Sequence, residues 1–228
     1  MSSAEACNRR PRSFVVAIDG PAASGKGTLA RRLAGRFGLA HLDTGKLYRA
    51  TALLVLDAGA DPADPEAATD AARRVDPASL GDPRLLGEPV ARASSVVAAI
   101  PTVRGALLQM QRHFAAHPPA PARGAVLDGR DIATAVCPDA SVKLFVTATP
   151  EARAQRRARE LRERGAAVIY RDVLQDMKER DARDSMRRVA PLAAAPDAVI
   201  LDTTGLDADQ ALEQASDIIA RALAAHDR

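Results

Sequence analysis

The chain has very few aromatic residues: Phe, Tyr and Trp make up 3% of its 228 residues, and tryptophan is absent. Surfaces that bind nucleic acids by base stacking need aromatic side chains beside positive charge, and the net charge here is only +3. The core must therefore be built from aliphatic side chains and alanine. An anionic small molecule fits this composition better than a polynucleotide.

Cysteines and long apolar runs are also scarce. Cys7 and Cys137 form no disulfide or metal-binding pattern, which indicates a reducing compartment. No apolar stretch approaches the ~18 residues of a membrane span, and the N-terminal residues lack the apolar centre of a signal peptide. We expect a cytoplasmic, monomeric protein with a disordered tail over residues 1–13 and a single domain over residues 14–228.

Lysine is rare too, since only four of the 32 basic residues are lysines. One of them, Lys26, closes a glycine-bounded loop between a predicted strand and a predicted helix. In such a phosphate-binding loop, backbone N–H groups and the helix N-terminus converge on phosphate oxygens while the lysine adds a point charge. A chance glycine-rich turn is the alternative. We predict nucleoside triphosphate binding by Gly20, Pro21, Ala22, Ala23, Ser24, Gly25, Lys26, Gly27 and Thr28.

The residue after the lysine departs from the usual pattern. Many phosphate-binding loops have a Ser or Thr there, whose hydroxyl contacts Mg²⁺, but this chain has Gly27 followed by Thr28. We therefore expect Mg²⁺ to enter with ATP, held mainly by phosphates and waters, with no direct protein ligand.

Short apolar runs alternate with helical patterns along the chain, which predicts an α/β fold: a five-stranded parallel sheet with helices on both faces. Two segments interrupt the alternation: residues 59–93, rich in proline and glycine, and an arginine-rich helical hairpin over residues 150–188. We expect the first to be an insertion with little core of its own. The predicted strands are 14–19, 39–42, 124–128, 142–147 and 198–202, and the helices 27–37, 45–58, 94–116, 150–164, 170–187 and 207–225.

Polar residues follow the second and third predicted strands. Thr44, Tyr48 and Arg49 begin a helix, where they suit a second anion, although Thr44 could simply cap that helix. Asp128 ends the next strand, where a carboxylate can face Mg²⁺. An ordinary turn is the alternative there, but a turn needs neither the Arg130 nor the second carboxylate, Asp131.

The hairpin supplies further cations. Arg180, Asp184 and Arg187 fall within an arc of ~60° on one helix face, which suits phosphates and a ribose hydroxyl. The alternative is a solvent-exposed helix face without a binding role, on which Arg180 and Asp184 form a local ion pair. Arg153 and Arg157 could reach over the site when the hairpin closes. RNA binding by the arginine-rich hairpin is a further alternative.

Several stretches together resemble the bacterial cytidylate kinase family: GPAASGKGT, LDTGKLYR, ASSVVAAIPTVRGALLQMQR, LDGRDIATAVCPDA and KERDARDSMRRVAPL. They run in order from about residue 14 to residue 204. The resemblance implies a phosphate-loop kinase fold with a monophosphate-binding insertion and a mobile helical lid. It also implies transfer of the ATP γ-phosphate to CMP or dCMP.

Residue roles follow from the resemblance by position. It implies cytosine recognition by Ser95, Arg104 and Asp131, a ribose contact by Asp184, and ATP contacts by the loop. From its place on the hairpin we expect Arg157 to contact ATP as well. The acceptor nucleotide would also meet Thr44, Tyr48, Arg49, Arg130, Arg180 and Arg187, and catalysis would rest on Lys26, Arg130, Asp131, Arg180 and Arg187. Between Tyr48 and Ser95 the chain is shorter than is usual in the family, so we expect the small sheet there to be trimmed or replaced by loop.

Two rival functions remain at this point. One is a phosphate-loop kinase for another acceptor, such as UMP, AMP or a non-nucleotide. The other is a nucleotide-gated RNA-binding protein without turnover.

Overall fold

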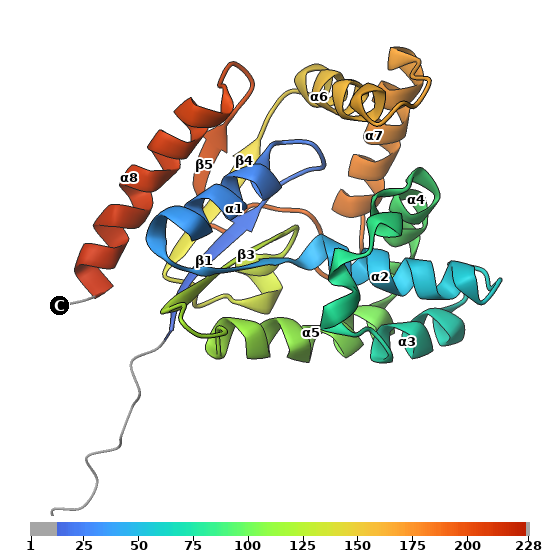
Figure 1. The fold of residues 1–228 in the computed structure, drawn as a ribbon, viewed down its shortest axis with the longest axis horizontal. Helices are drawn as coiled ribbons and strands as arrows, with labels where there is room; N and C mark the ends of the chain where they lie inside the picture. Colours follow the sequence, from blue (N-terminus) through green and yellow to red (C-terminus); the bar gives the residue numbers. More distant parts are fainter. Residues whose placement is uncertain (1–12, 227–228) are drawn as a thin grey trace, which may run out of the picture.

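The computed structural model describes residues 13–226, so the predicted tail lies outside it except for Ser13. Its centre is a parallel sheet with the strand order β2-β3-β1-β4-β5 (Figure 1). The strands begin and end within a residue or so of the predicted bounds. They are β1 (Phe14–Asp19), β2 (Ala40–Asp43), β3 (Gly124–Gly129), β4 (Val142–Thr147) and β5 (Val199–Asp202).

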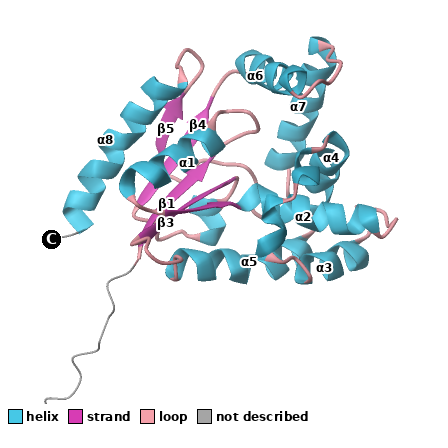
Figure 2. Cartoon of the chain, viewed as in Figure 1, coloured by secondary structure: helices cyan, strands magenta, loops and turns pink. Residues whose placement is uncertain are grey.

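Helices follow the strands and lie on both sides of the sheet (Figure 2). The α-helices in the described residues are α1 (Lys26–Phe37), α2 (Thr44–Asp57), α3 (Pro65–Arg73), α4 (Glu88–Val97), α5 (Pro101–Ala116), α6 (Pro150–Glu163), α7 (Tyr170–Ser185) and α8 (Ala208–His226). Two short 3₁₀ helices, η1 (Pro77–Gly81) and η2 (Pro83–Leu86), precede α4, and a π-helical turn, η3 (Ile132–Val136), follows β3.

The sheet is covered on both faces, as predicted. Every residue of β1 and β3 is buried, because neither face of these central strands meets water. Val16 and Ile18 pack with α1 and α8, whereas the alternating residues Val15 and Ala17 join α2 and α5 in a second cluster. The aliphatic and alanine-rich core expected from the composition is present in both clusters.

Residues 59–93 form no core of their own and instead pack into the main one. Ala68, Ala71 and Ala72 of α3 are buried in the same cluster as α2 and α5. Asp64 caps α3 by accepting hydrogen bonds from the N–H groups of Glu66 and Ala67. No strand occurs in residues 59–93, all of which the structure describes, so helices replace the small sheet.

The predicted helix over residues 94–116 is two helices. Ile100 is extended, with φ −83° and ψ 118°, and α5 begins at Pro101. A residue before proline is pushed away from helical backbone angles, so Pro101 ends the first helix and starts the second. This break lets α4 lie beside α2 while α5 runs under the sheet.

Helices α6 and α7 form the predicted hairpin, with Gly165 at φ 80° in the turn that follows α6. Figure 1 shows the hairpin, in gold and orange, on the side of the molecule away from α8. Within residues 13–226, no helix has both the length and the apolar character needed to cross a bilayer.

The shared core of the insertion can be tested by thermal or urea unfolding of Leu85→Ala. Leu85 is 1% exposed and belongs to the main core cluster, so its truncation should cost about 2–5 kcal/mol. The matched control is Leu86→Ala, because Leu86 is 44% exposed and should change stability by less than about 0.5 kcal/mol. Similar, small losses for both variants would show that the insertion folds outside the core.

Candidate active site

The loop after β1 is shaped by backbone constraints. Gly20 has φ 149°, and a Cβ there would lie 2.0 Å from the carbonyl oxygen of Val146, so only glycine fits. Gly25, at φ 90°, is the residue before α1. The loop thus curls into the N-terminus of a twelve-residue helix, where free N–H groups and the helix dipole attract anions. The predicted loop residues 20–28 therefore have a geometry that suits an anion.

Lys26 lies within this loop, where its Nζ donates to the carbonyl oxygen of Pro21 at 3.3 Å. Burial and, after it, the nearby guanidinium of Arg130 lower the pKa of Lys26 to about 7, against the opposing charges of Asp128 and Asp43. A lysine held close to neutrality is poised to gain charge when an anion arrives.

Two carboxylates face each other beside Lys26. Asp43 and Asp128 are paired in register at the ends of β2 and β3. Burial raises the pKa of Asp43, and the charge of Asp128 raises it further. A Cβ on Gly27 would lie 3.1 Å from Asp128 Oδ2, so the missing hydroxyl leaves space next to a hard oxygen donor. This donor set suits Mg²⁺ with part of its water shell.

A second set of residues gathers at the end of β3 and the start of α5. Arg104 and Asp131 form a buried salt bridge. Arg104 also donates to the carbonyl oxygen of Ala98 at 3.2 Å and lies 5.4 Å from the centroid of the Tyr48 ring. Ser95, one helical turn before Ala98, instead accepts from Arg183 at 3.4 Å. The structure brings the predicted base-recognition residues to one place, and it adds Arg183, which sequence reasoning missed.

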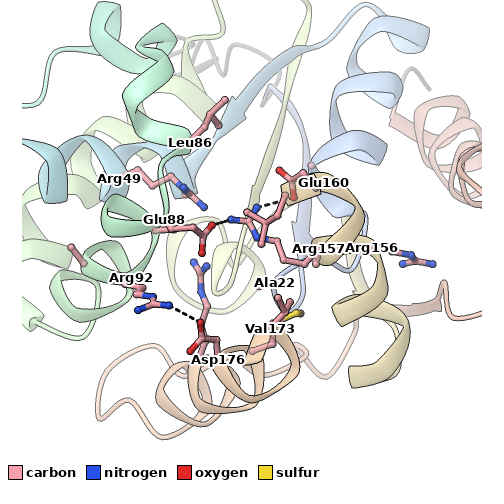
Figure 3. A pocket seen from close by; sticks show the side chains of 18 of the residues that line it. Ala22, Arg49, Leu86, Glu88, Arg92, Arg156, Arg157, Glu160, Val173 and Asp176 are labelled. Atoms are coloured by element: carbon pink, nitrogen blue, oxygen red, sulfur yellow. Dashed lines mark hydrogen bonds and ion pairs between the residues drawn. The ribbon is translucent and has the colours of Figure 1, made fainter. Parts of the chain in front are cut away.

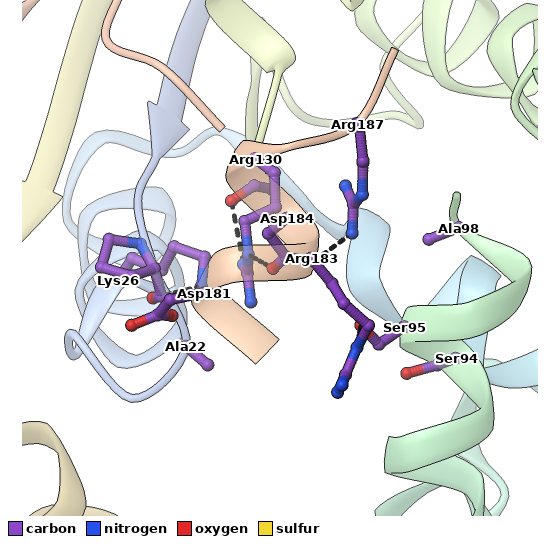
Figure 4. A network of polar contacts seen from close by, with 12 residues as sticks. Ala22, Lys26, Ser94, Ser95, Ala98, Arg130, Asp181, Arg183, Asp184 and Arg187 are labelled. Atoms are coloured by element: carbon purple, nitrogen blue, oxygen red, sulfur yellow. Dashed lines mark hydrogen bonds and ion pairs between the residues drawn. The ribbon is translucent and has the colours of Figure 1, made fainter. Parts of the chain in front are cut away.

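Asp184 lies at the centre of a charged network (Figure 4). Its carboxylate accepts from Arg130 Nε at 3.0 Å and from Arg187, and it is 1% exposed. Burial disfavours its charge, but Arg130, Arg187 and Arg180 together hold its pKa below the usual value. The Arg180–Asp184 pair considered from the sequence is therefore not the dominant contact. Arg187 also lies beyond α7, which ends at Ser185.

The positive charge of Arg180 is only partly offset by nearby carboxylates. Its pKa is lowered to about 9, first by burial and then by repulsion from Arg130. Within the described part of the chain, neither Arg180 Nε nor Arg187 Nε has a hydrogen-bond partner. Buried guanidinium N–H groups without acceptors indicate that an anionic ligand completes this site.

Arg157 and Arg49 point into the same cavity from α6 and α2 (Figure 3). Arg157 forms ion pairs with Glu88 of α4 and, at 2.8 Å, with Glu160. Arg49 donates to the carbonyl oxygen of Leu85 at 2.7 Å. The arginines predicted to meet phosphate are thus held by carboxylates and carbonyls in this structure.

Thr44 does not cap its helix, and the capping interpretation is wrong. Asp43 occupies the cap position, while the Thr44 hydroxyl donates to the carbonyl oxygen of Asp128 at 2.7 Å. This buried contact ties the start of α2 to the end of β3.

The base of the hairpin is attached to the phosphate loop. Arg153 donates to the carbonyl oxygen of Ala22 at 3.2 Å and to Asp181 at 2.7 Å, so it links the phosphate loop to α7. Arg156 reaches the carbonyl oxygen of Ser24 at 3.3 Å and Thr203 Oγ1 at 3.0 Å. The sequence did not single out Arg156, because α6 contains several arginines and no pattern distinguishes this one from the others.

A cavity lined by the phosphate loop, Arg49, Arg130, Arg157 and Arg180 has a volume of about 1430 Å³. A site for one small ligand is usually about 300–1,000 Å³, so there is room for two. The phosphate loop lines one part, α4 with the insertion lines another, and Arg130 and Arg180 lie between them.

Comparison with known proteins decides the family. The sequence profile described as "Cytidylate kinase" matches residues 16–221. The chain is 62% identical over 207 residues to a cytidylate kinase of Rhodospirillum rubrum, covering 91% of this chain and 97% of that protein. It is 58% identical over 207 residues to a cytidylate kinase of Paramagnetospirillum magneticum, covering 91% and 98%. The chain belongs to the cytidylate kinase family.

As a cytidylate kinase family member, the chain is a kinase that uses ATP and nucleotide substrates. The predicted α/β phosphate-loop kinase fold is confirmed. The RNA-binding alternative is not favoured.

Binding of ATP at pH 8 should take up most of a proton. In the ligand-free protein the pKa of Lys26 is about 7, so the lysine is mostly neutral at pH 8, and bound phosphates favour its charged form. Calorimetric titrations in two buffers of different ionisation enthalpy measure this uptake. It should vanish for this group at pH 6, where Lys26 is already charged, and in Lys26→Met. The same uptake in Lys26→Met and the wild type would contradict the assignment.

Proposed function

We propose that the protein transfers the γ-phosphate of ATP to CMP or dCMP, giving ADP and CDP or dCDP. The observation that carries this proposal is one large cavity lined by the phosphate loop with Lys26 and by Arg49, Arg130 and Arg180. The buried Arg104–Asp131 pair lies next to it, because Asp131 directly follows the lining residue Arg130. The enzyme acts as a monomer, since one chain supplies all of these groups, and in the cytoplasm, where both nucleotides are available.

ATP would bind with its phosphates in the loop of residues 20–28. Gly20, Gly25 and the N-terminus of α1 offer backbone N–H groups, and Lys26 supplies the charge. Arg157 would exchange Glu88 and Glu160 for the outer phosphates, because a guanidinium forms bidentate bonds with phosphate oxygens. Support comes from the position of Arg157 on the cavity wall.

Cytosine would be recognised by the Arg104–Asp131 pair and Ser95. A carboxylate accepts from the N4 amino group of cytosine, and a guanidinium donates to N3 or O2. Uracil would place a carbonyl against Asp131, leaving a buried acceptor unpaired, and such mismatches discriminate strongly. Tyr48 supports Arg104 through its ring face.

The acceptor phosphate would lie among Arg49, Arg130, Arg180 and Arg187, with Thr44 fixing the backbone beside them. Asp184 would accept from a ribose hydroxyl. Both of its oxygens already accept from arginines, so a missing 2′-hydroxyl would leave no unpaired group, and dCMP should serve as well as CMP.

Asp43 and Asp128 would hold Mg²⁺ through its water molecules, opposite Gly27. The ion would supply charge neutralisation between the phosphates of ATP.

Catalysis would then rest on placement and charge. The acceptor phosphate oxygen is already anionic, so no strong general base is needed. Lys26, Arg130, Arg180 and Arg187 would neutralise charge on the transferring phosphoryl group, and Asp131 would orient the acceptor. Closure of the lid, residues 150–188, would exclude water, so ATP hydrolysis without CMP should be slow.

A coupled ADP-release assay with ATP and each of CMP, dCMP, UMP and AMP tests the function. CMP and dCMP should give a kcat/KM at least about 100-fold above UMP and AMP, because unpaired buried polar groups reject the wrong base. Lys26→Met should reduce kcat by at least about 100-fold. Preference for UMP or AMP would favour the rival kinase, and tight salt-sensitive RNA binding without turnover would favour the RNA binder.

Asp131→Asn tests base recognition. The amide oxygen can still accept from Arg104, while the new amino group can donate to O4 of uracil. The ratio of kcat/KM for CMP over UMP should fall by about tenfold or more. Asp61→Asn is the control, because Asp61 lines the same cavity but only caps a local turn. An unchanged ratio in Asp131→Asn would remove Asp131 from base recognition.

A further inference from the structure

Asp19 is a buried carboxylate to which no role has yet been assigned. It is the last residue of β1, it is 1% exposed, and no salt bridge to it occurs within residues 13–226. Its two oxygens each accept one backbone hydrogen bond: Oδ1 from the N–H of Ile132 and Oδ2 from the N–H of Ala133, both at 2.8 Å.

Burial of this carboxylate is unfavourable. Desolvation is the largest cause that raises the pKa of Asp19 to about 6; the charge of Asp131 acts in the same direction, whereas the two N–H groups and Lys26 oppose the rise. A structural cap alone does not require a charged group here, because a neutral side chain could accept a hydrogen bond at lower desolvation cost. The two N–H groups belong to Ile132 and Ala133, directly after Arg130 and Asp131, and this position gives the charged carboxylate a role.

Asp19 joins the two halves of the site directly. On its own strand it immediately precedes Gly20, the first residue of the phosphate loop. The N–H groups that it holds begin η3, immediately after Arg130 and Asp131. One side chain therefore connects the loop for one nucleotide to the segment that carries two of the contacts for the other.

The held segment has little freedom to adjust. A Cβ on Gly129 would lie 2.6 Å from Thr44 Oγ1 and 2.7 Å from Ile132 Cδ1, so the chain from 129 to 132 is tightly packed. A shift of Ile132 would therefore move Arg130 and Asp131 with it rather than be absorbed locally.

We propose that Asp19 is a positioning residue that fixes Arg130 and Asp131 relative to the phosphate loop and so sets the alignment of the acceptor with the donor phosphate. The proposal rests on the proposed function for the identity of the acceptor. It assigns Asp19 no contact with either nucleotide.

The test is Asp19→Asn, assayed for KM and kcat with CMP and with ATP. Asparagine keeps the shape but can accept only one of the two N–H bonds and turns a donor toward the other. KM for CMP should rise about tenfold or more, the usual size of effect when one buried hydrogen bond is lost. KM for ATP should stay within about twofold, since the loop backbone is unchanged, and the preference for CMP over UMP should fall.

Asp207→Asn is the matched control. Asp207 likewise accepts two backbone N–H bonds, from Asp209 and Gln210, but does so at the start of α8. Both KM values should stay within about twofold in this variant.

If Asp19→Asn does not fold, Asp19→Ser removes the buried charge as well as one acceptor and should give the same split. Equal changes in both KM values, or none in either, would show that Asp19 serves stability only. The wild type is assayed first: if it does not phosphorylate CMP, the proposed function fails, and the split is then measured with whichever acceptor it does use.

Discussion

Repulsion between buried arginines is the constraint on which the site depends. Arg49, Arg130, Arg157, Arg180 and Arg187 reach one region from four parts of the chain. Burial and mutual repulsion lower the pKa values of Arg49, Arg180 and Arg187. Asp184 and Glu88 offset only part of this charge. The remainder is left for phosphate groups, which makes the ligand-free state electrostatically incomplete.

The five arginines stay close together only because the fold holds them in place against their mutual repulsion. The parallel sheet brings the ends of β1, β2 and β3 to one edge, where the phosphate loop, Asp43 and Arg130 emerge together. The insertion contributes through its packing, since α3 and Leu85 share the core with α2, and the carbonyl of Leu85 holds Arg49. The same hydrophobic cluster thus stabilises the chain and anchors a functional arginine.

The strands and the phosphate loop could be predicted because short apolar runs and glycine spacing are local signals. The insertion could not, for two physical reasons. Prolines at 65 and 89 favour loop over helix in the sequence, yet each lies in the first turn of a helix, where its missing N–H costs nothing. Alanine side chains such as those of Ala68, Ala71 and Ala72 are also too small to give a strong periodic pattern, although these three are buried.

Side-chain partners were harder to predict than elements. The residue types at the site were identified, but the Arg104–Asp131 pair joins residues 27 positions apart, and the Arg130–Asp184 bond joins residues 54 apart. Helical spacing offered only a local partner, Arg180, for Asp184. Asp19 gave no signal at all, because an aspartate that ends a strand is common and its partners lie on another strand's loop.

The hydrogen bond from Arg153 to the carbonyl oxygen of Ala22 fixes one end of the α6–α7 hairpin to the phosphate loop. The inner end of the hairpin is held by buried hydrogen bonds. Farther along, the hairpin meets α4 through the partly buried pair Arg157–Glu88 and the exposed pair Arg92–Asp176, with side chains 71% and 51% accessible. Exposed pairs are worth about 0–1 kcal/mol and are screened by salt. The outer part of the hairpin can therefore move while its inner end stays bound to the phosphate loop. Ionic strength should then change the rate of product release and leave the structure of the phosphate loop unchanged.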